Sequence, residues 1–210
     1  MLFPPLYAIV DSTVVTNPLD FARQLADAGV RLIQIRDKRA SSRKLFEQSK
    51  ALADLLVPEG VKLIVNDRPD IAAIAEASGV HVGQDDLPVE HARSICKPPS
   101  WVGISTHNLQ QLQAAALTSA DYIAVGPIFP TVTKENPDPV VGLEFLRAAR
   151  RETRKPLVAI GGITLATAES VFEAGADSVA VIRDLAAASG PAEQARKYLT
   201  IAERVCFERS

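Results

Sequence analysis

Two threonines and a lysine in one short loop are the residues that most clearly point to chemistry in this sequence. The loop holds Thr131, Thr133 and Lys134, and it follows an apolar run at residues 122–125. A buried strand holds the loop after it in a fixed place, and two hydroxyl donors beside an ammonium group suit a phosphate. On this stretch alone, a polar surface turn is an equally good interpretation.

Polar residues also follow the earlier apolar runs. Gln34, Arg36 and Lys38 alternate, so they share one face of a strand with a period of two. Asp67 and Asp86 stand at the ends of the next two runs. Two neighbouring carboxylates could form a general acid/base pair or bind Mg²⁺, and the nearby cations favour Mg²⁺ together with a substrate phosphate. The simpler interpretations are a half-exposed strand, a turn at Asp67 and a helix cap at Asp86.

A glycine pair indicates a second anion site. Gly161 and Gly162 follow an apolar run, where backbone N–H groups can approach a phosphate at the start of the next helix. His81 and His107 stand at strand ends, and a hydrogen-bonding role explains each as well as proton transfer does. His91 falls in a polar helical segment, where we expect it to be exposed. The sequence has no Ser-His-Asp order and no Cys-His pairing, so we expect no covalent mechanism.

Hydrophobic periodicity predicts the elements that would position these residues. Short apolar or β-branched runs alternate with amphipathic stretches of helical period. The predicted strands are residues 6–10, 31–36, 62–66, 80–82, 101–105, 122–125, 156–160 and 178–182. The predicted helices are residues 20–28, 42–56, 70–77, 109–117, 143–151, 165–174 and 191–205. Eight such units predict an α/β fold, a parallel eight-stranded (β/α)8 TIM barrel that forms a single domain over residues 1–210.

Composition excludes several classes of protein. The chain of 210 residues is 47% hydrophobic and 23% charged, which is typical of a soluble globular protein. A net charge of -2 gives no basic excess for binding nucleic acid. Cys96 and Cys206 have no partner spacing, so we expect neither zinc nor a disulfide framework and favour a reducing cytoplasm. No apolar run reaches the length of a membrane span, so we expect no membrane anchor.

Six motifs, in order along nearly the whole chain, resemble those of the thiamine phosphate synthase family. They are Gln34-x-Arg36-x-Lys38, residues 65–68 (VNDR), 79–88 (GVHVGQDDLP), 103–108 (GISTHN), 125–134 (VGPIFPTVTK) and 159–163 (AIGGI). The resemblance implies a (β/α)8 barrel that joins 4-amino-2-methyl-5-hydroxymethylpyrimidine diphosphate to 4-methyl-5-(2-phosphooxyethyl)thiazole. The products would be thiamine phosphate and pyrophosphate. It also implies a dissociative reaction, in which pyrophosphate leaves first and the thiazole nitrogen captures a pyrimidine-methyl cation.

The resemblance also implies roles for individual residues. Those that would hold the diphosphate are Arg36, Lys38, Asn66 and Lys134, and those facing the pyrimidine are Gln34, His81 and Ser105. Asp67 and Asp86 would bind Mg²⁺. The thiazole phosphate would be held by Thr131, Thr133, Gly162 and the backbone near Ile182. The catalytic residues would be Lys134, Ser105 and Arg36.

The sequence departs from the family pattern in a few places. Arg183 stands where the family often has Ser, and it would either add a charge to the thiazole-phosphate site or point to solvent. Asp37 and Asp85 replace the common Glu. The expected partners are small phosphorylated substrates, and a homo-oligomer is compatible with the sequence. The alternatives are a thiazole tautomerase-like isomerase, which needs no diphosphate or metal groups, and a non-catalytic phosphate-binding regulator on the same barrel.

Overall fold

The computed structural model describes residues 3–131 and 138–208, and within them eight parallel strands close into a barrel in sequence order. The strands are β1 (Leu6–Asp11), β2 (Leu32–Arg36), β3 (Lys62–Asn66), β4 (Gly79–Val82), β5 (Trp101–Thr106), β6 (Tyr122–Val125), β7 (Leu157–Ile160) and β8 (Ser178–Val181). Pairing of β1 with β8 closes the ring. The predicted (β/α)8 barrel is confirmed, and every predicted strand is present to within one or two residues.

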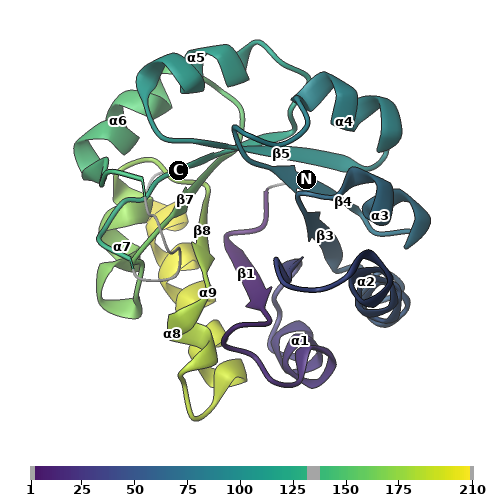
Figure 1. Cartoon of the computed structure of the whole chain (residues 1–210). Helices are drawn as coiled ribbons and strands as arrows, with labels where there is room; N and C mark the ends of the chain where they lie inside the picture. Colours follow the sequence, from purple (N-terminus) through teal and green to yellow (C-terminus); the bar gives the residue numbers. More distant parts are fainter. Residues whose placement is uncertain (1–2, 132–137, 209–210) are drawn as a thin grey trace.

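Helices surround the barrel (Figure 1). They are α1 (Pro18–Asp27), α2 (Ser42–Leu56), α3 (Pro69–Ile74), α4 (Val89–Ile95), α5 (Leu109–Ala116), α6 (Gly142–Glu152), α7 (Leu165–Glu173), α8 (Arg183–Ala186) and α9 (Pro191–Glu208). The predicted helices are all present. The list of predicted helices omits α4, although a helical segment around His91 was expected, and it misses α8, because four residues are too few to show a period. In the described part of the chain, no helix is long and apolar enough to cross a membrane.

Alternation along the strands separates two apolar layers. Ala8, Ile33 and Ile35 belong to the larger cluster, which packs the barrel against the helices. The smaller cluster contains Tyr7, Ile9, Leu32, Ile64, Tyr122, Ala124, Val158 and Ala180, and it fills the barrel interior. Because side chains alternate, Gln34 and Arg36 share the face of Leu32 and point inward. The predicted common face of these two residues is therefore confirmed.

Candidate active site

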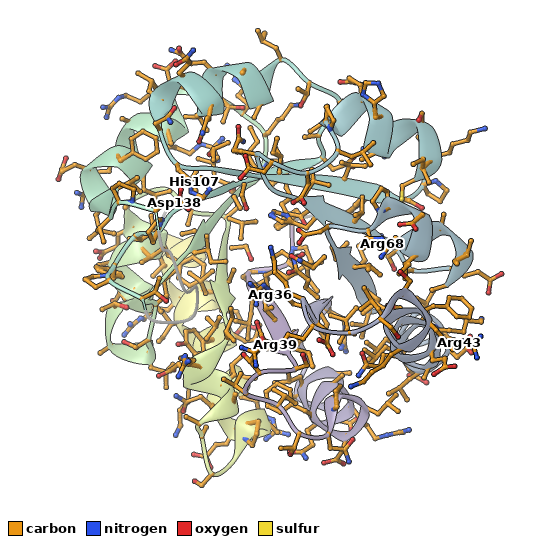
Figure 2. All side chains as sticks on the ribbon, viewed as in Figure 1. Arg36, Arg39, Arg43, Arg68, His107 and Asp138 are labelled. Atoms are coloured by element: carbon orange, nitrogen blue, oxygen red, sulfur yellow. The ribbon has the colours of Figure 1, made fainter. Side chains whose placement is uncertain are left out.

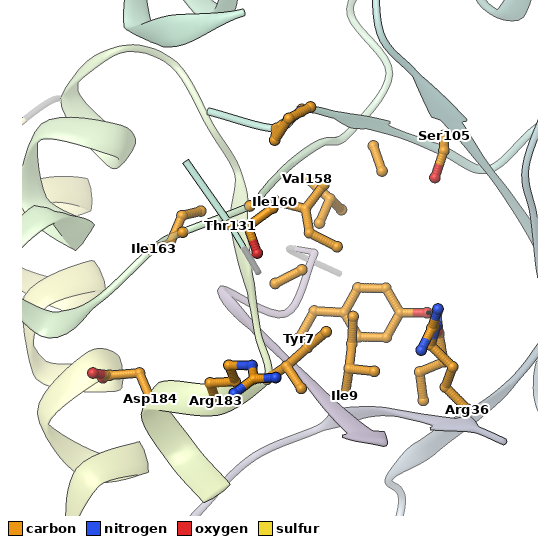
Figure 3. Close-up of a pocket in the computed structure, with 18 of the residues that line it drawn as sticks. Tyr7, Ile9, Arg36, Ser105, Thr131, Val158, Ile160, Ile163, Arg183 and Asp184 are labelled. Carbon is orange, nitrogen blue, oxygen red and sulfur yellow. Dashed lines mark hydrogen bonds between the residues drawn. The ribbon is translucent and has the colours of Figure 1, made fainter. Parts of the chain in front are cut away.

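A pocket of about 480 Å³ opens at the carboxyl ends of the strands (Figure 3). This is the end of a (β/α)8 barrel at which substrates bind. Nine of the predicted substrate-binding residues line it: Gln34, Arg36, Asn66, His81, Ser105, Thr131, Gly162, Ile182 and Arg183. Its floor is apolar and includes Ile9, Val158 and Ile160. Lys38 lies beside Asp67, away from this lining, and Thr133 and Lys134 lie outside the described residues.

An ion pair fixes Arg36 at the rim. Strand register places Arg36 opposite Asp11, and Nη1 of Arg36 pairs with Oδ2 of that buried carboxylate. Burial alone would raise the pKa of Asp11, but hydrogen bonds from the Thr13 hydroxyl and backbone N–H, together with the Arg36 charge, lower it. Asp11 therefore stays ionised and orients the guanidinium, whose other N–H groups can serve an anion.

Lys38, Asp67 and Asp86 form a second polar cluster at the rim. The Asp37 carboxylate accepts from the Arg39 and Ala40 backbone N–H groups at 3.1 and 3.0 Å, which turns the chain around Lys38. Lys38 Nζ then lies 3.1 Å from Asp67 Oδ2. Asp86 also lies within hydrogen-bonding reach of Asp67, so one of the expected basic residues, Lys38, lies with both carboxylates, whereas Arg36 pairs with Asp11.

The two carboxylates fit a magnesium ion. Asp86 Oδ2 accepts from the Gly83 backbone N–H at 2.7 Å, which fixes one oxygen. Burial, and then the neighbouring Asp67, raise the pKa of Asp86, so negative charge here is poorly compensated by the protein alone. Within residues 3–131 and 138–208 no group of three or more His, Cys, Asp or Glu could hold a metal. A pair is enough for Mg²⁺, which is usually held by one or two carboxylates plus substrate phosphate oxygens.

Ser105 and His81 belong to a hydrogen-bonded chain that crosses the barrel interior. His81 Nε2 lies 2.8 Å from Ser105 Oγ, and His81 Nδ1 lies 3.1 Å from the Tyr122 hydroxyl. The Tyr122 and Tyr7 hydroxyls are 2.9 Å apart, and Gln34 Nε2 donates to Tyr7 at 2.6 Å. The sequence interpretation found Gln34, His81 and Ser105 but missed both tyrosines, because each lies within a run of otherwise apolar strand residues.

The opposite side of the pocket is formed by the ends of β6, β7 and β8. Phe129 N–H donates to the Gly161 carbonyl at 3.0 Å, so the loops after β6 and β7 run against each other. Gly162 has φ +64°, and a Cβ there would lie 2.4 Å from the Pro130 carbonyl oxygen. Only glycine fits this position, which brings the backbone next to Thr131. The Gly161-Gly162 pair therefore marks the point where the backbone of the loop after β7 lies close to the loop after β6.

Arg183 lines the pocket at the start of α8 (Figure 3). The next residue, Asp184, accepts hydrogen bonds from the Tyr198 hydroxyl at 2.6 Å and from Gln194 Nε2 at 2.9 Å, which ties α8 to α9. Of the two alternatives for Arg183, the structure favours a position at the site. Sequence patterns could not decide between the two alternatives, because the direction of the Arg183 side chain depends on helix α8, which the sequence analysis did not detect.

His107 lies at the end of β5 and borders the same pocket. Its Nδ1 is 2.6 Å from the Gly126 carbonyl oxygen, which can only accept, so Nδ1 carries the hydrogen. Its Nε2 faces Asp138 Oδ2 at 3.5 Å, and the two side chains lie side by side in Figure 2. His107 therefore contacts both ends of the connection between β6 and α6. His91 is exposed on α4, as expected.

Comparisons with known proteins agree with this site. The profile of the family described as thiamine monophosphate synthase matches residues 6–185. A thiamine-phosphate synthase of Koribacter versatilis is 50% identical over 204 residues, covering 94% of this chain and 95% of that protein. One of Syntrophomonas wolfei is 40% identical and covers 95% and 96% of the two chains.

A solved structure agrees as well. The thiamine phosphate pyrophosphorylase of Pyrococcus furiosus superposes with a TM-score of 0.87 at 33% identity, over 96% of both chains. The similarity thus includes the barrel and every strand end that lines the pocket. On sequence and structure together, this chain belongs to the thiamine monophosphate synthase family of transferases.

Proposed function

We propose that this chain condenses 4-amino-2-methyl-5-hydroxymethylpyrimidine diphosphate with 4-methyl-5-(2-phosphooxyethyl)thiazole, giving thiamine phosphate and pyrophosphate. The single observation that carries the proposal is a pocket with polar groups on two sides and an apolar floor between them. Arg36 lines one side, with the cluster of Lys38, Asp67 and Asp86 at the rim outside the lining, whereas Thr131 and Gly162 line the other side. A substrate with two phosphates and one with a single phosphate require such a division.

The reaction on the diphosphate side would be dissociative. The bond between the pyrimidine methylene carbon and the bridging oxygen breaks, its electron pair leaves with pyrophosphate, and the thiazole nitrogen then donates its lone pair to the resulting cation. Arg36, Lys38 and Asn66 would bind the departing oxygens, and Lys134 would join them from the loop after β6. Charged donors fixed before the reaction stabilise a leaving anion without reorganising during the step.

The pyrimidine would lie against Gln34, His81 and Ser105. Ser105 would donate its hydroxyl hydrogen to the substrate, which makes it a catalytic residue together with Arg36 and Lys134. Ile9, Val158 and Ile160 would exclude water from the methylene carbon. Exclusion matters because water competes with the thiazole nitrogen for a carbocation.

Asp67 and Asp86 would hold Mg²⁺ next to the diphosphate. When bound, the ion would neutralise charge on the phosphate oxygens. Asp86 keeps one oxygen on Gly83 N–H, so its carboxylate stays oriented, and Lys38 places a second positive charge beside Asp67. The pair supports this role because the two carboxylates lie within hydrogen-bonding reach of each other beside a single lysine, Lys38.

The thiazole phosphate would bind on the other side of the pocket. The groups proposed to hold it are Thr131, Thr133, Gly162, the Ile182 backbone and Arg183. Gly162 lines the pocket and has no side chain of its own, which supports a contact between its backbone and the phosphate. Arg183 adds a positive charge that Ser could not supply.

Single-turnover release of pyrophosphate tests this proposal. The protein would be mixed with the pyrimidine diphosphate, with and without the thiazole phosphate and Mg²⁺, and the organic product identified by mass. We expect thiamine phosphate only when all three are present. Binding of the thiazole phosphate without pyrophosphate release under any condition would refute the synthase and favour the isomerase or the regulator.

We also propose a cytoplasmic location, a single domain over the whole chain and small phosphorylated molecules as its partners, with no nucleic acid or membrane. The pocket residues of the described ranges come from one barrel, and a homo-oligomer is compatible with them. Fractionation of cells and light scattering on the purified protein test the location and the oligomeric state.

A further inference from the structure

The hydrogen-bonded chain from Gln34 to Ser105 contains one member that does not line the pocket. Tyr7, Gln34, His81 and Ser105 all border the cavity, whereas Tyr122 is fully buried. Its hydroxyl lies 2.9 Å from the Tyr7 hydroxyl and 3.1 Å from His81 Nδ1. Tyr122 can therefore affect a bound substrate only through its neighbours.

Tight packing fixes the Tyr122 ring. It stacks on His81 with ring centroids 5.5 Å apart and meets Tyr7 edge-on at 5.8 Å. On β5, Gly103 leaves room for it, because a Cβ there would lie 2.0 Å from Tyr122 Cζ. The missing side chain at Gly103 thus allows a phenol to reach the middle of the barrel. A ring held on three sides keeps its hydroxyl in one position.

The donors in this chain run in one direction. Gln34 Nε2 can only donate, so the Tyr7 oxygen accepts, and the single Tyr7 hydrogen points to Tyr122. The Tyr122 hydrogen then points to His81 Nδ1. An imidazole that accepts at Nδ1 carries its hydrogen at Nε2, which donates to Ser105 Oγ. The Ser105 hydrogen is left to point into the pocket.

Both phenols keep their hydrogens. Burial raises the pKa of Tyr7 and that of Tyr122 well above the usual range of tyrosine, so both stay neutral near pH 7. The orientation of the Gln34 amide sets the direction of donation along the chain. If Oε1 faced Tyr7, each hydrogen bond from Gln34 to Ser105 would have its donor and acceptor exchanged. Ser105 would then donate to His81 and offer only lone pairs to a ligand.

We propose that Tyr122 is a positioning residue: by donating to His81 Nδ1 it fixes the Nε2–H tautomer of His81, so that the Ser105 hydroxyl donates into the pocket. The part of this inference that concerns the pyrimidine substrate rests on the function proposed above. The part that concerns the tautomer does not. A hydroxyl that is already oriented needs no reordering when the substrate binds.

Nitrogen-15 NMR of the histidine rings tests the tautomer directly. The chain has three histidines, so labelling gives three imidazole groups, and His91→Gln and His107→Gln variants assign the other two signals and so leave that of His81. We expect His81 in the wild-type protein to show a protonated Nε2 and a bare Nδ1. A protonated Nδ1 on neutral His81 would mean that the chain runs the other way and would overturn the proposal.

Tyr122→Phe keeps the ring and removes only the hydroxyl. We expect His81 to lose its single tautomer, and kcat to fall about 10- to 100-fold while KM for the pyrimidine diphosphate changes less than about threefold. An unchanged tautomer with an unchanged kcat would overturn the proposal. The expected fall in kcat with the wild-type tautomer of His81 retained would also overturn it, because the Tyr122 hydroxyl would then act by another route.

Tyr198→Phe is the matched control. Tyr198 is also a buried tyrosine, and its hydroxyl bonds Asp184 between α8 and α9 rather than in the barrel interior. This variant should keep the wild-type tautomer of His81, which separates the specific effect from the loss of any buried phenol. The NMR result needs no turnover. If the wild-type protein made no thiamine phosphate, the proposed function would fail while the tautomer assignment would still be decided.

Discussion

Replacing Asp86 by Asn should stabilise the protein in the absence of Mg²⁺ and weaken its response to Mg²⁺. Asp86 lies within hydrogen-bonding reach of Asp67, so two carboxylates lie close together when no Mg²⁺ is bound between them. The Asn side chain keeps an oxygen for the Gly83 backbone N–H, which donates at 2.7 Å in the wild-type protein. Its NH₂ group can donate to Asp67, so a repulsion is replaced by a hydrogen bond.

The size of the effect follows from the charges and their exposure. Two like charges about 4 Å apart repel by about 4 kcal/mol at an effective dielectric constant of 20. The pair is partly exposed, with the Asp67 side chain 21% accessible, and Lys38 Nζ lies 3.1 Å from Asp67. Water and this lysine screen the repulsion, which leaves a gain of about 1 kcal/mol. For a domain of this size, that raises Tm by about 2–4 °C.

Mg²⁺ should reverse the order of the two Tm values, so that the wild-type protein becomes more stable than Asp86→Asn. Binding at a concentration 100 times Kd stabilises the wild-type fold by about 2.7 kcal/mol. Asn is neutral, so the variant loses one of the two charged oxygen ligands and most of this stabilisation. Thermal unfolding of both proteins, measured with EDTA and across a series of MgCl₂ concentrations, gives both effects in one experiment.

Asp85→Asn is the matched control. It removes the same charge one residue away, from an exposed side chain, so Tm and the response to Mg²⁺ should stay close to wild type. Two results would refute the reasoning. A lower Tm for Asp86→Asn in EDTA would mean that the two carboxylates do not repel, and an undiminished Mg²⁺ shift would mean that Asp86 is not a ligand.

Three further predictions concern other parts of the site. Gly103→Ala should destabilise the fold by about 1–3 kcal/mol in urea unfolding, because the new Cβ meets Tyr122 at 2.0 Å; Gly190→Ala, with its nearest atom at 3.8 Å, should not. Lys134→Ala should lower turnover by about 10²- to 10³-fold with an unchanged circular dichroism spectrum, and unchanged turnover would remove Lys134 from the mechanism. Burial raises the pKa of Asp11, but hydrogen bonds and the Arg36 charge outweigh burial, so the pKa in the folded protein lies below the unfolded value of 3.8. The contribution of ionised Asp11 to the stability of the fold is therefore complete above pH 3.8 and is lost as pH falls through the lower pKa of the folded state. Asp11→Asn should therefore flatten the acid side of the stability curve, and an unaltered acid side would contradict this assignment.

The sequence predicts the barrel well because its strands are buried on both faces. Strands β3 and β6 begin and end at the predicted residues, since their apolar runs are bounded by polar or turn residues on each side. Helix α2 also matches at both ends, where Ser41 caps the first turn. Helix α8 could not be found this way, because its four residues contain less than two turns.

Side-chain partners within the site were harder to predict than positions. The sequence analysis placed Arg36 on a strand face, but its pairing with Asp11 depends on the register between β1 and β2. Tyr7 and Tyr122 are 115 residues apart, and each looks like one apolar residue in an apolar strand. Only closure of the barrel brings their hydroxyls together, so no local pattern in the sequence contains this contact.

Charged and neutral polar groups occupy different depths in the barrel, and this separation suits the dissociative reaction proposed above. At the rim, the charged groups are paired, as in Arg36 with Asp11 and Lys38 with Asp67. In the interior, the polar groups are neutral phenols, an amide and an imidazole linked to one another. A full charge placed there would be costly, whereas neutral hydrogen-bonded groups can be buried at little cost. The rim can therefore hold the departing diphosphate while the interior orients the pyrimidine ring without attracting water or a competing ion.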